Sequence, residues 1–339
     1  MTSLPPIERF TANTGAVIYR IPVEAFPGFI AYCYVLLNAG IPTLIDTGSG
    51  IGSSTAQLIK GIEALRDDFS ESVALADLKR IIITHGHIDH FGGLAHLHER
   101  TGAQVAVHQL DRRVLTNYEE RVIVATKDLR VYLERAGVKA HLRENLMLMY
   151  GFAKKEFRSV PVDVALDDGM VLDTMTFLHT PGHCPGQVCI IIGDVLISAD
   201  HILAQTTPHQ SPESITHYTG LGHYLDSLKV VSRVGGLRLA LGGHEAPIHD
   251  VYGRIGAIRD SHMRKLDRVI ETIRTAAKPC SISDISKAMY PERGGYDVLL
   301  ALEEVGAHVE YLYEHGMLEV SNLAEVEARD NPALLYGLA

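Results

Sequence analysis

Six residues, His85–His90, constrain the fold of this chain more than any other segment, because they place four potential metal ligands in one short loop. The loop follows residues 80–84, whose short, β-branched and apolar sequence predicts a buried strand. Open α/β sheets place their chemistry in loops at the carboxyl ends of such strands. Imidazole and carboxylate groups suit zinc or iron. The segment therefore predicts a metal site at one edge of a buried sheet.

Four further strand-like segments lead into a histidine or an aspartate. One of them enters the turn at residues 180–186, in which two prolines and two glycines place His183 at the apex. Strand ends of this kind can meet at one edge of a sheet, so we expect all five to contribute to one site. The residues at the four additional strand ends are Asp46, His183, Asp200 and His244.

The order of these residues along the chain resembles the metallo-β-lactamase superfamily in its binuclear form. The resemblance extends over about residues 15–250, and it is specific because every ligand position is filled on the expected element. It implies an α/β fold, an αββα metallo-β-lactamase sandwich, with two divalent metal ions at its rim. Zinc is the expected metal, and iron and manganese are the alternatives.

The resemblance implies that three histidines, His85, His87 and His183, hold the first metal. It also implies that Asp200 bridges both ions. His201 directly follows Asp200 and is the alternative ligand there, but the carboxylate is preferred. A histidine in a turn can also be purely structural, and this alternative stays open for His183.

The second metal would be held by Asp89, His90 and His244. In the same pattern Asp46 lies outside the ligand set and orients a ligand histidine by hydrogen bonding. Its structural alternative is a cap on the turn at residues 47–48. Asp89 would also be catalytic, because a ligand of the second metal can orient the attacking water and carry its proton.

The chain is long enough for one large α/β domain and a smaller one. We expect a catalytic domain over residues 1–255, with a helical insertion at about 111–157. Residues 256–339 contain three helical patterns followed by a short strand at 317–320. This order resembles the carboxyl-terminal winged-helix module of some β-lactamase-like hydrolases.

The charge of the carboxyl-terminal region disfavours nucleic acid as a partner. Residues 259–339 contain nine Lys or Arg and fourteen Asp or Glu, a net charge of −5, and the whole chain has a net charge of −10. The helix expected at residues 296–314, which would enter a groove, has five acidic residues and no basic one. A phosphate-binding face needs the opposite charge. Packing against the catalytic domain or a partner subunit is the preferred role, and a homodimer is one form of it.

The expected reaction is hydrolysis by a water molecule that the metals activate near neutral pH. β-Lactamases proper generally lack a carboxylate at the Asp200 position, which disfavours a lactam. Thioesters of acyl-CoA or acylglutathione type suit the site, because a thiolate leaves without a proton. Activated esters and lactones are close alternatives. An endoribonuclease or phosphodiesterase is the alternative. A metal-binding interaction protein without activity is the third hypothesis.

Three residues are candidates for contact with a small-molecule acyl substrate. His217 and Tyr218 lie in a loop-like segment between Asp200 and His244, and Tyr150 lies on the apolar face of the helical insertion. For each of them the structural alternative stays open: a solvated loop for the first two, and helix packing for Tyr150.

Neither a signal-peptide pattern nor a run of eighteen apolar residues occurs in the sequence. We therefore expect no membrane association and a cytoplasmic location. The four cysteines have no CxxC spacing and no disulfide-scaffold density. Cys184 lies next to a candidate ligand, but the metal site already supplies a nucleophile, so packing is its expected role.

Overall fold

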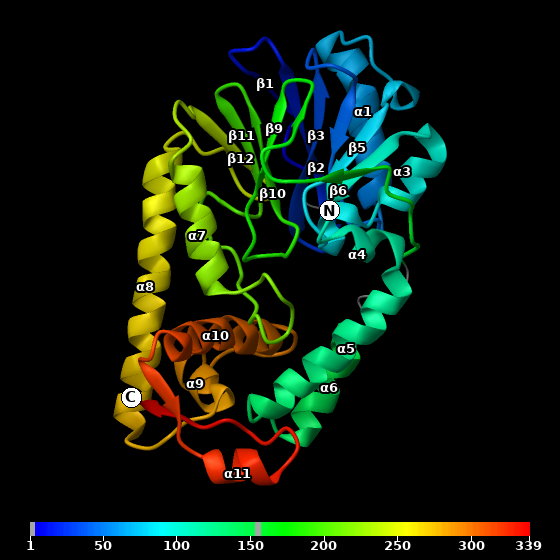
Figure 1. The fold of residues 1–339 in the computed structure, drawn as a ribbon. Helices are drawn as coiled ribbons and strands as arrows, with labels where there is room; N and C mark the ends of the chain where they lie inside the picture. Colours follow the sequence, from blue (N-terminus) through cyan, green and yellow to red (C-terminus); the bar gives the residue numbers. More distant parts are fainter. Residues whose placement is uncertain (1–3, 153–156) are drawn as a thin grey trace. The chain divides into compact units, whose positions relative to one another are not determined.

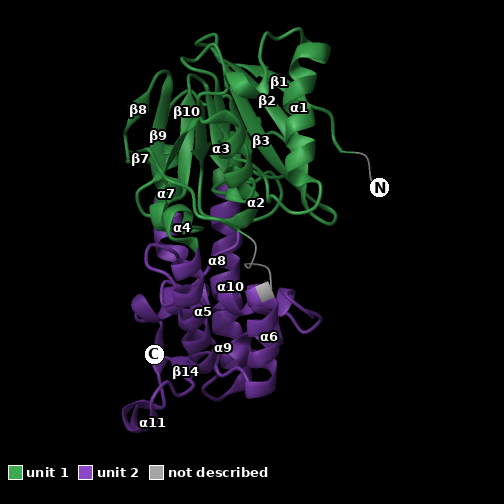
Figure 2. Ribbon diagram, turned by 90° about the vertical axis from the view of Figure 1, so that its right-hand side faces the viewer, with its two compact units in different colours: residues 1–118, 157–208, 227–255 green, residues 119–156, 209–226, 256–339 purple. Residues whose placement is uncertain are grey.

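The computed structural model describes residues 4–152 and 157–339. The chain divides into two compact units (Figure 2). The first unit contains residues 1–118, 157–208 and 227–255, and the second contains residues 119–156, 209–226 and 256–339. The predicted boundary between residues 255 and 256 lies within one continuous helix. Residues 153–156 of the predicted insertion lie outside the described residues.

The first unit contains a seven-stranded sheet in which the strands follow one another in sequence order, from β1 to β7. The first four strands pair antiparallel, and β4 to β7 pair parallel. The strands are β1 (Glu8–Thr11), β2 (Val17–Phe26), β3 (Phe29–Leu37), β4 (Thr43–Ile45), β5 (Arg80–Ile83), β6 (Gln104–His108) and β7 (Val164–Leu166).

A second sheet in the same unit has five strands in the order β12-β11-β10-β9-β8. Its strands β8 to β11 pair antiparallel, whereas β11 and β12 pair parallel. The strands are β8 (Val171–Leu172), β9 (Met175–His179), β10 (Val188–Ile192), β11 (Val195–Ala199) and β12 (Leu239–Gly242).

The hydrophobic core takes side chains from both sheets, which face each other in Figure 1. The two faces of strand β2 explain why most of its residues are apolar. Ile18 belongs to this core, whereas Tyr19 and Ile21 lie on the opposite face of the strand. Helix α1 (Ser54–Phe69) covers that opposite face: the rings of Tyr19 and Phe69 are 5.1 Å apart, and Gly61 lets α1 approach Ile21. The strand is thus buried on both sides.

Short helices and loops connect the strands of the first unit. The one-turn helix α2 begins soon after β5, and the 227–255 segment contributes the end of α7 and the start of α8. These elements are η1 (Leu75–Asp77), α2 (Ile88–Phe91), α3 (Leu94–Thr101), α4 (Arg112–Thr116), α7 (Leu221–Ser232) and α8 (Val251–Ala276).

The second unit is mainly helical and combines the insertion with the carboxyl-terminal region. The Tyr132 hydroxyl donates to the Leu302 carbonyl, and the backbone amides of Ser283 and Leu334 donate to carbonyls at the end of α5. Its remaining elements are α5 (Tyr118–Arg135), α6 (Ala140–Phe152), α9 (Ile282–Met289), α10 (Asp297–Glu314), β13 (Leu318–Val320), α11 (Leu323–Ala328) and β14 (Tyr336–Leu338).

The structure contains the strands and helices predicted from the sequence, together with others that were not predicted, among them β1, β2, β3 and α1. Helix α11 and strand β14 were not predicted, and β14 pairs antiparallel with β13 to form a two-stranded sheet. Strand β14 is only three residues long, so its apolar pattern is too short to distinguish it from a loop. Among the described residues, no helix combines the length and the apolar composition needed to cross a membrane.

Candidate metal centre

The five predicted strand ends lie at one edge of the two facing sheets. Strands β4 and β5 run parallel, as do β11 and β12. Strand β9 has the same direction as β11, because both pair antiparallel with β10. Within each sheet the carboxyl ends therefore point the same way, and the loops that leave them carry the candidate ligands.

Three histidines from two of these loops form a first group that can hold a metal ion. His85 Nε2 and His87 Nδ1 lie 3.1 Å apart, and the His87 and His183 rings are 4.6 Å apart. His85 is fully buried because it closely follows the central strand β5. We call these three residues the three-histidine group.

Asp89, His90 and His244 form a second group. The helix α2 turns Asp89 and His90 toward the loop after β12, where His244 Nε2 lies 3.2 Å from Asp89 Oδ2. The Nδ1–H of His244 donates to the Ile30 carbonyl at 2.7 Å, which leaves its Nε2 for a ligand. We call these residues the mixed group.

The Asp200 carboxylate lies between the two groups. Its Oδ1 is 3.4 Å from His90 Nε2, and its Oδ2 is 3.3 Å from His244 Nε2 and 3.7 Å from His183 Nε2. It thus faces one histidine of the three-histidine group and two of the mixed group. The neighbouring His201 is buried, and none of the three possible metal-binding groups around Asp200 includes it.

Asp46 makes hydrogen bonds that orient residues of the centre. Its Oδ1 accepts from the Thr84 amide, and its Oδ2 accepts from the Thr84 hydroxyl and from His90 Nδ1, each at 2.8 Å. The Thr84 hydroxyl also lies 3.1 Å from His85 Nδ1. A single buried carboxylate therefore orients a histidine of each group.

The loop that carries His244 is held against strand β3. The Tyr34 hydroxyl donates to the Gly242 carbonyl, and the Tyr32 amide donates to the Gly243 carbonyl. A side chain at Gly243 would collide with the site, because a Cβ there would lie 2.2 Å from Asp200 Oδ1 and 2.6 Å from His90 Cε1. Glycine at this position lets the backbone approach the carboxylate.

Two members of the three-histidine group, His85 and His87, are held neutral. Burial and the neighbouring histidines set the pKa of His85 well below its ordinary value, and burial with His183 lowers the pKa of His87 to about 3. Neutral imidazole is the form that binds a metal.

The mixed group has the opposite balance. Although burial opposes it, the adjacent carboxylates raise the pKa of His244 to about 10 and that of His90 well above its ordinary value. Burial alone would raise the pKa of Asp89, but His90 and His244 lower it to about 2. A metal ion that binds this group therefore displaces protons.

The polar atoms of the centre fit a metal ion. His90 Nε2 and Asp200 Oδ1 are buried and have no hydrogen-bond partner among the described residues. Leaving buried polar atoms without a partner is costly unless a ligand satisfies them. The donor set of imidazole nitrogens and carboxylate oxygens matches the ligands of zinc and of other first-row metals.

The model of one protein family matches most of this chain. The Metallo-beta-lactamase superfamily model covers residues 26–271. The chain belongs to the metallo-β-lactamase superfamily.

Two crystal structures show the same fold as this superfamily member. A metallo-beta-lactamase family protein from Thermus thermophilus has a TM-score of 0.75 at 24% identity and covers 95% of this chain and 98% of its own. A beta-lactamase domain protein from Burkholderia ambifaria has a TM-score of 0.72 at 22% identity, with coverages of 98% and 94%.

Two curated proteins are similar in sequence to this superfamily member. "Probable metallo-hydrolase YflN" of Bacillus subtilis (strain 168) is 26% identical over 192 residues, or 56% of this chain, and the chain spans 61% of its length. "Acyl-coenzyme A thioesterase MBLAC2" of Bos taurus is 28% identical over 213 residues, which are 59% of this chain and 68% of that protein.

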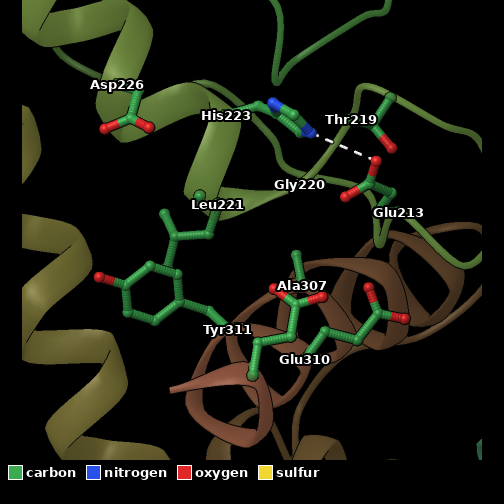
Figure 3. Close-up of a pocket in the computed structure, with 11 residues that line it drawn as sticks. Glu213, Thr219, Gly220, Leu221, His223, Asp226, Ala307, Glu310 and Tyr311 are labelled. Carbon is green, nitrogen blue, oxygen red and sulfur yellow. Dashed lines mark hydrogen bonds and ion pairs between the residues drawn. The ribbon is translucent and has the colours of Figure 1, made fainter.

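The candidate substrate residues Tyr150, His217 and Tyr218 lie in the second unit, whereas all the metal ligands predicted from the sequence lie in the first. The loop with His217 and Tyr218 borders a cavity of about 230 Å³ (Figure 3). Four of its eleven lining residues are acidic, and the His223 Nε2 lies 3.2 Å from a carboxylate oxygen of Glu213. The acidic residues that line the cavity are Glu213, Asp226, Glu310 and Glu314.

Two residues near the centre were not predicted from the sequence. Phe29 is 44% exposed at the tip of the β2–β3 hairpin, and its ring centroid lies 4.4 Å from that of His244. An aromatic residue beside the Pro27-Gly28 turn is the signal that would have drawn attention to it. Asp111 lies in the loop after β6 and has no motif of its own; only its contacts identify it.

A fourth group of possible ligands lies in the second unit and consists of His262, Glu304 and His308. The Lys265 ammonium is 2.6 Å from Glu304 Oε1, and His262 Nδ1 is 3.1 Å from His308 Nε2. The Lys265 ammonium already provides the positive charge that balances this carboxylate, so we interpret the group as a buried structural network.

Proposed function

We propose that this chain is a metal-dependent hydrolase with a binuclear centre. The position of Asp200 is the observation that carries the proposal, because its two oxygens face histidines of both the three-histidine group and the mixed group. A carboxylate in that position suits a bridge between two ions. The seven proposed ligands are His85, His87, Asp89, His90, His183, Asp200 and His244.

Zinc is the proposed metal, and iron and manganese are the alternatives, because the ligands are imidazoles and carboxylates without a thiolate. When bound, two such ions supply a water molecule activated near neutral pH and a positive charge for the developing oxyanion. Asp89 would orient the attacking water through one carboxylate oxygen and accept its proton. With His90 and His244 beside it, the Asp89 carboxyl has a pKa of about 2 and is ionised, which is the form that binds a metal ion.

A thioester is the proposed substrate class, of acyl-CoA or acylglutathione type, with activated esters and lactones as close alternatives. The similarity to an acyl-coenzyme A thioesterase supports it. The exposed Phe29 ring beside His244 supplies an apolar surface for an acyl group. A thiolate leaving group needs no general acid, so the proposed residues are sufficient for the reaction. Tyr150, His217 and Tyr218 stay candidates for substrate contact.

Residues 256–339 are proposed to form a winged-helix module attached to a catalytic domain at residues 1–255. The order α8, α9, α10 and β13, with β14 paired to β13, supports this proposal. The net charge of −5 and the acidic residues of the cavity argue against nucleic acid as a partner, which disfavours the endoribonuclease hypothesis. A homodimer and a cytoplasmic location stay predictions from the sequence.

The test measures turnover by the full-length protein, loaded with zinc, against a panel of acyl-CoA thioesters, an acylglutathione, a lactone and a single-stranded RNA. We expect thioester turnover, which His85→Ala reduces by at least about 10³-fold because it removes a ligand from a buried group. The matched control is His96→Ala, which removes an exposed histidine on α3.

Each result has a distinct meaning. RNA cleavage without thioester turnover would replace the thioester proposal with the endoribonuclease hypothesis. Metal binding without turnover of any substrate would favour the metal-binding interaction protein. Equal activity in His85→Ala and the wild type would show that the metal centre takes no part in the reaction.

A further inference from the structure

Asp111 is a buried carboxylate just outside the proposed ligand set. It is 1% exposed and lies between strand β6 and helix α4, with its backbone amide bonded to the His108 carbonyl at 2.9 Å. A buried carboxylate is costly unless hydrogen-bond donors surround it. The identity of those donors indicates what Asp111 does.

The carboxylate of Asp111 joins the two loops that carry the three-histidine group. Its Oδ2 accepts from the Gly86 amide at 2.7 Å and from the Cys184 thiol at 3.2 Å. Its Oδ1 accepts from the Gly186 amide at 3.0 Å. Gly86 lies between His85 and His87, and Cys184 directly follows His183, so these contacts are made close to the proposed ligands.

We propose that Asp111 is a positioning residue that sets the distance between the His85–His87 loop and the His183 loop. The two loops leave different sheets, because the first follows β5 and the second connects β9 to β10. The geometry of the three-histidine group therefore depends on how the sheets meet at this edge. The inference rests on the proposed role of the three histidines as metal ligands.

The close approach of the loops to Asp111 supports this role. A Cβ on Gly186 would lie 2.5 Å from Asp111 Cγ, and one on Gly86 would lie 3.3 Å from it. Glycine at position 186 therefore lets the backbone reach the carboxylate. The Asp111 side chain thus occupies the space that a side chain at Gly186 would need.

The ring of His179 provides a second anchor for the same loop. Its Nε2 lies 2.7 Å from the Pro185 carbonyl, and it stacks on His108 with the ring centroids 3.9 Å apart. This stack joins β9 to β6. It therefore fixes the His183 loop at the end of β9, the strand from which the loop starts. Asp111 and the His108–His179 pair thus hold the His183 loop at two points.

The mixed group depends on other anchors. Asp46 orients His90, and the Ile30 carbonyl orients His244. Loss of the Asp111 carboxylate should therefore weaken metal binding at the three-histidine group and leave the mixed group unchanged. A residue with a merely structural role would affect both groups equally.

The experiment titrates zinc into the metal-free full-length protein in competition with a chromophoric chelator. His183→Ala and His244→Ala identify the binding step that belongs to each group. We expect Asp111→Ala to lower the affinity of the three-histidine group about 10- to 100-fold, the usual effect of losing a residue that orients ligands. Asp111→Asn keeps one acceptor oxygen and should give an intermediate loss.

Asp163→Ala is the matched control, because this carboxylate also accepts a backbone amide, that of Val105, at the other end of β6. It should bind zinc as the wild type does. If Asp111→Ala does not fold, Gly186→Ala tests the same contact, since the added methyl group would lie 2.5 Å from Asp111 Cγ and 2.8 Å from its backbone nitrogen and so displaces the residue. That variant should show the same selective loss.

Wild-type affinity at both groups in Asp111→Ala, or an equal loss at both, would overturn the inference and leave the proposed function intact. A wild-type protein that binds no metal would overturn both. Selective loss of the three-histidine site supports the inference whatever substrate the protein hydrolyses, because the measurement requires no turnover.

Discussion

Asp46 shows how one buried residue controls several others. Its backbone has a φ of 60°, in the left-handed region that aspartate and asparagine tolerate better than most residues. That conformation turns the carboxylate beneath the site, where it bonds to Thr84 and His90. The strength of the site therefore depends on a residue that does not itself belong to either group.

The substitution Asp46→Asn tests this dependence. Asparagine fits the backbone conformation but cannot accept from all three donors, because its amide nitrogen is itself a donor. We expect zinc affinity at the mixed group to fall about 10- to 100-fold, since His90 loses its orientation. Chelator competition measures the affinity, and circular dichroism checks the fold.

Asp173→Asn is the matched control for that variant. Asp173 also has a positive φ, 54°, and its carboxylate pairs with Arg80 at 2.8 Å. It lies in the turn between β8 and β9, and it makes no described contact with the centre. Equal zinc affinities in Asp46→Asn and Asp173→Asn would contradict the orienting role.

At the scale of elements, helix α10 holds the loop at residues 209–220 through acidic side chains. Glu304 accepts from the Gln210 amide at 2.9 Å, and Glu310 accepts from the Ser214 hydroxyl. His209 Nε2 lies 3.0 Å from Glu303. The acidic face of α10, which disfavours binding in a groove of nucleic acid, thus has a structural role within the second unit.

The pKa of Glu310 predicts a pH dependence for this contact. Burial raises the pKa from 4.5 to about 7, and Glu314 adds to the effect while Ser214 opposes it. The folded protein therefore keeps a proton that the unfolded chain releases above pH 4.5. The resulting stability is complete below pH 4.5 and is lost as the pH rises through 7.

Glu310→Gln removes this titration. The wild type loses this stability as the pH rises from about 5 to about 8, and the variant does not. We therefore expect the free energy of unfolding of Glu310→Gln, relative to that of the wild type, to be about 1–2 kcal/mol higher at pH 8 than at pH 5, after allowance for solvent screening. Urea unfolding at the two pH values measures the difference. Glu319→Gln, which removes an exposed charge from β13, is the control, and parallel pH curves for Glu310→Gln and the wild type would refute the prediction.

At the scale of the whole molecule, metal binding should stabilise the first unit. The proposed ligands come from loops after β5, β9, β11 and β12, so an ion would join strand ends of two sheets. Zinc at about 100 times its dissociation constant should add about 2.7 kcal/mol to the free energy of unfolding. Calorimetry with and without a chelator measures the shift.

His183→Ala should abolish most of this shift, whereas the exposed His96→Ala should retain it. A melting profile that is the same with zinc and with the chelator would contradict a metal site at this edge. The second unit should melt independently of zinc, because none of the seven proposed ligands lies in it.

Periodicity and ligand order predict much of the molecule. Short apolar runs before polar residues predicted the strands β4, β5, β9, β11 and β12 and the residues that follow them, because local sequence determines both the strand and where it ends. Helix α9 is one of the three predicted helical patterns, and its cap is also local in sequence, because the Asp284 amide donates to the Ser281 hydroxyl. Three-residue strands such as β14 carry no comparable signal.

The sequence by itself determined which residues can bind metal and on which strand ends they lie, because those properties depend on residue type and on neighbours along the chain. Only the tertiary structure decided which oxygen of Asp200 faces which histidine, that Asp111 joins two loops and that Phe29 lies against His244. These contacts connect residues tens or hundreds of positions apart. They exist because two sheets pack face to face, and no local pattern encodes that packing.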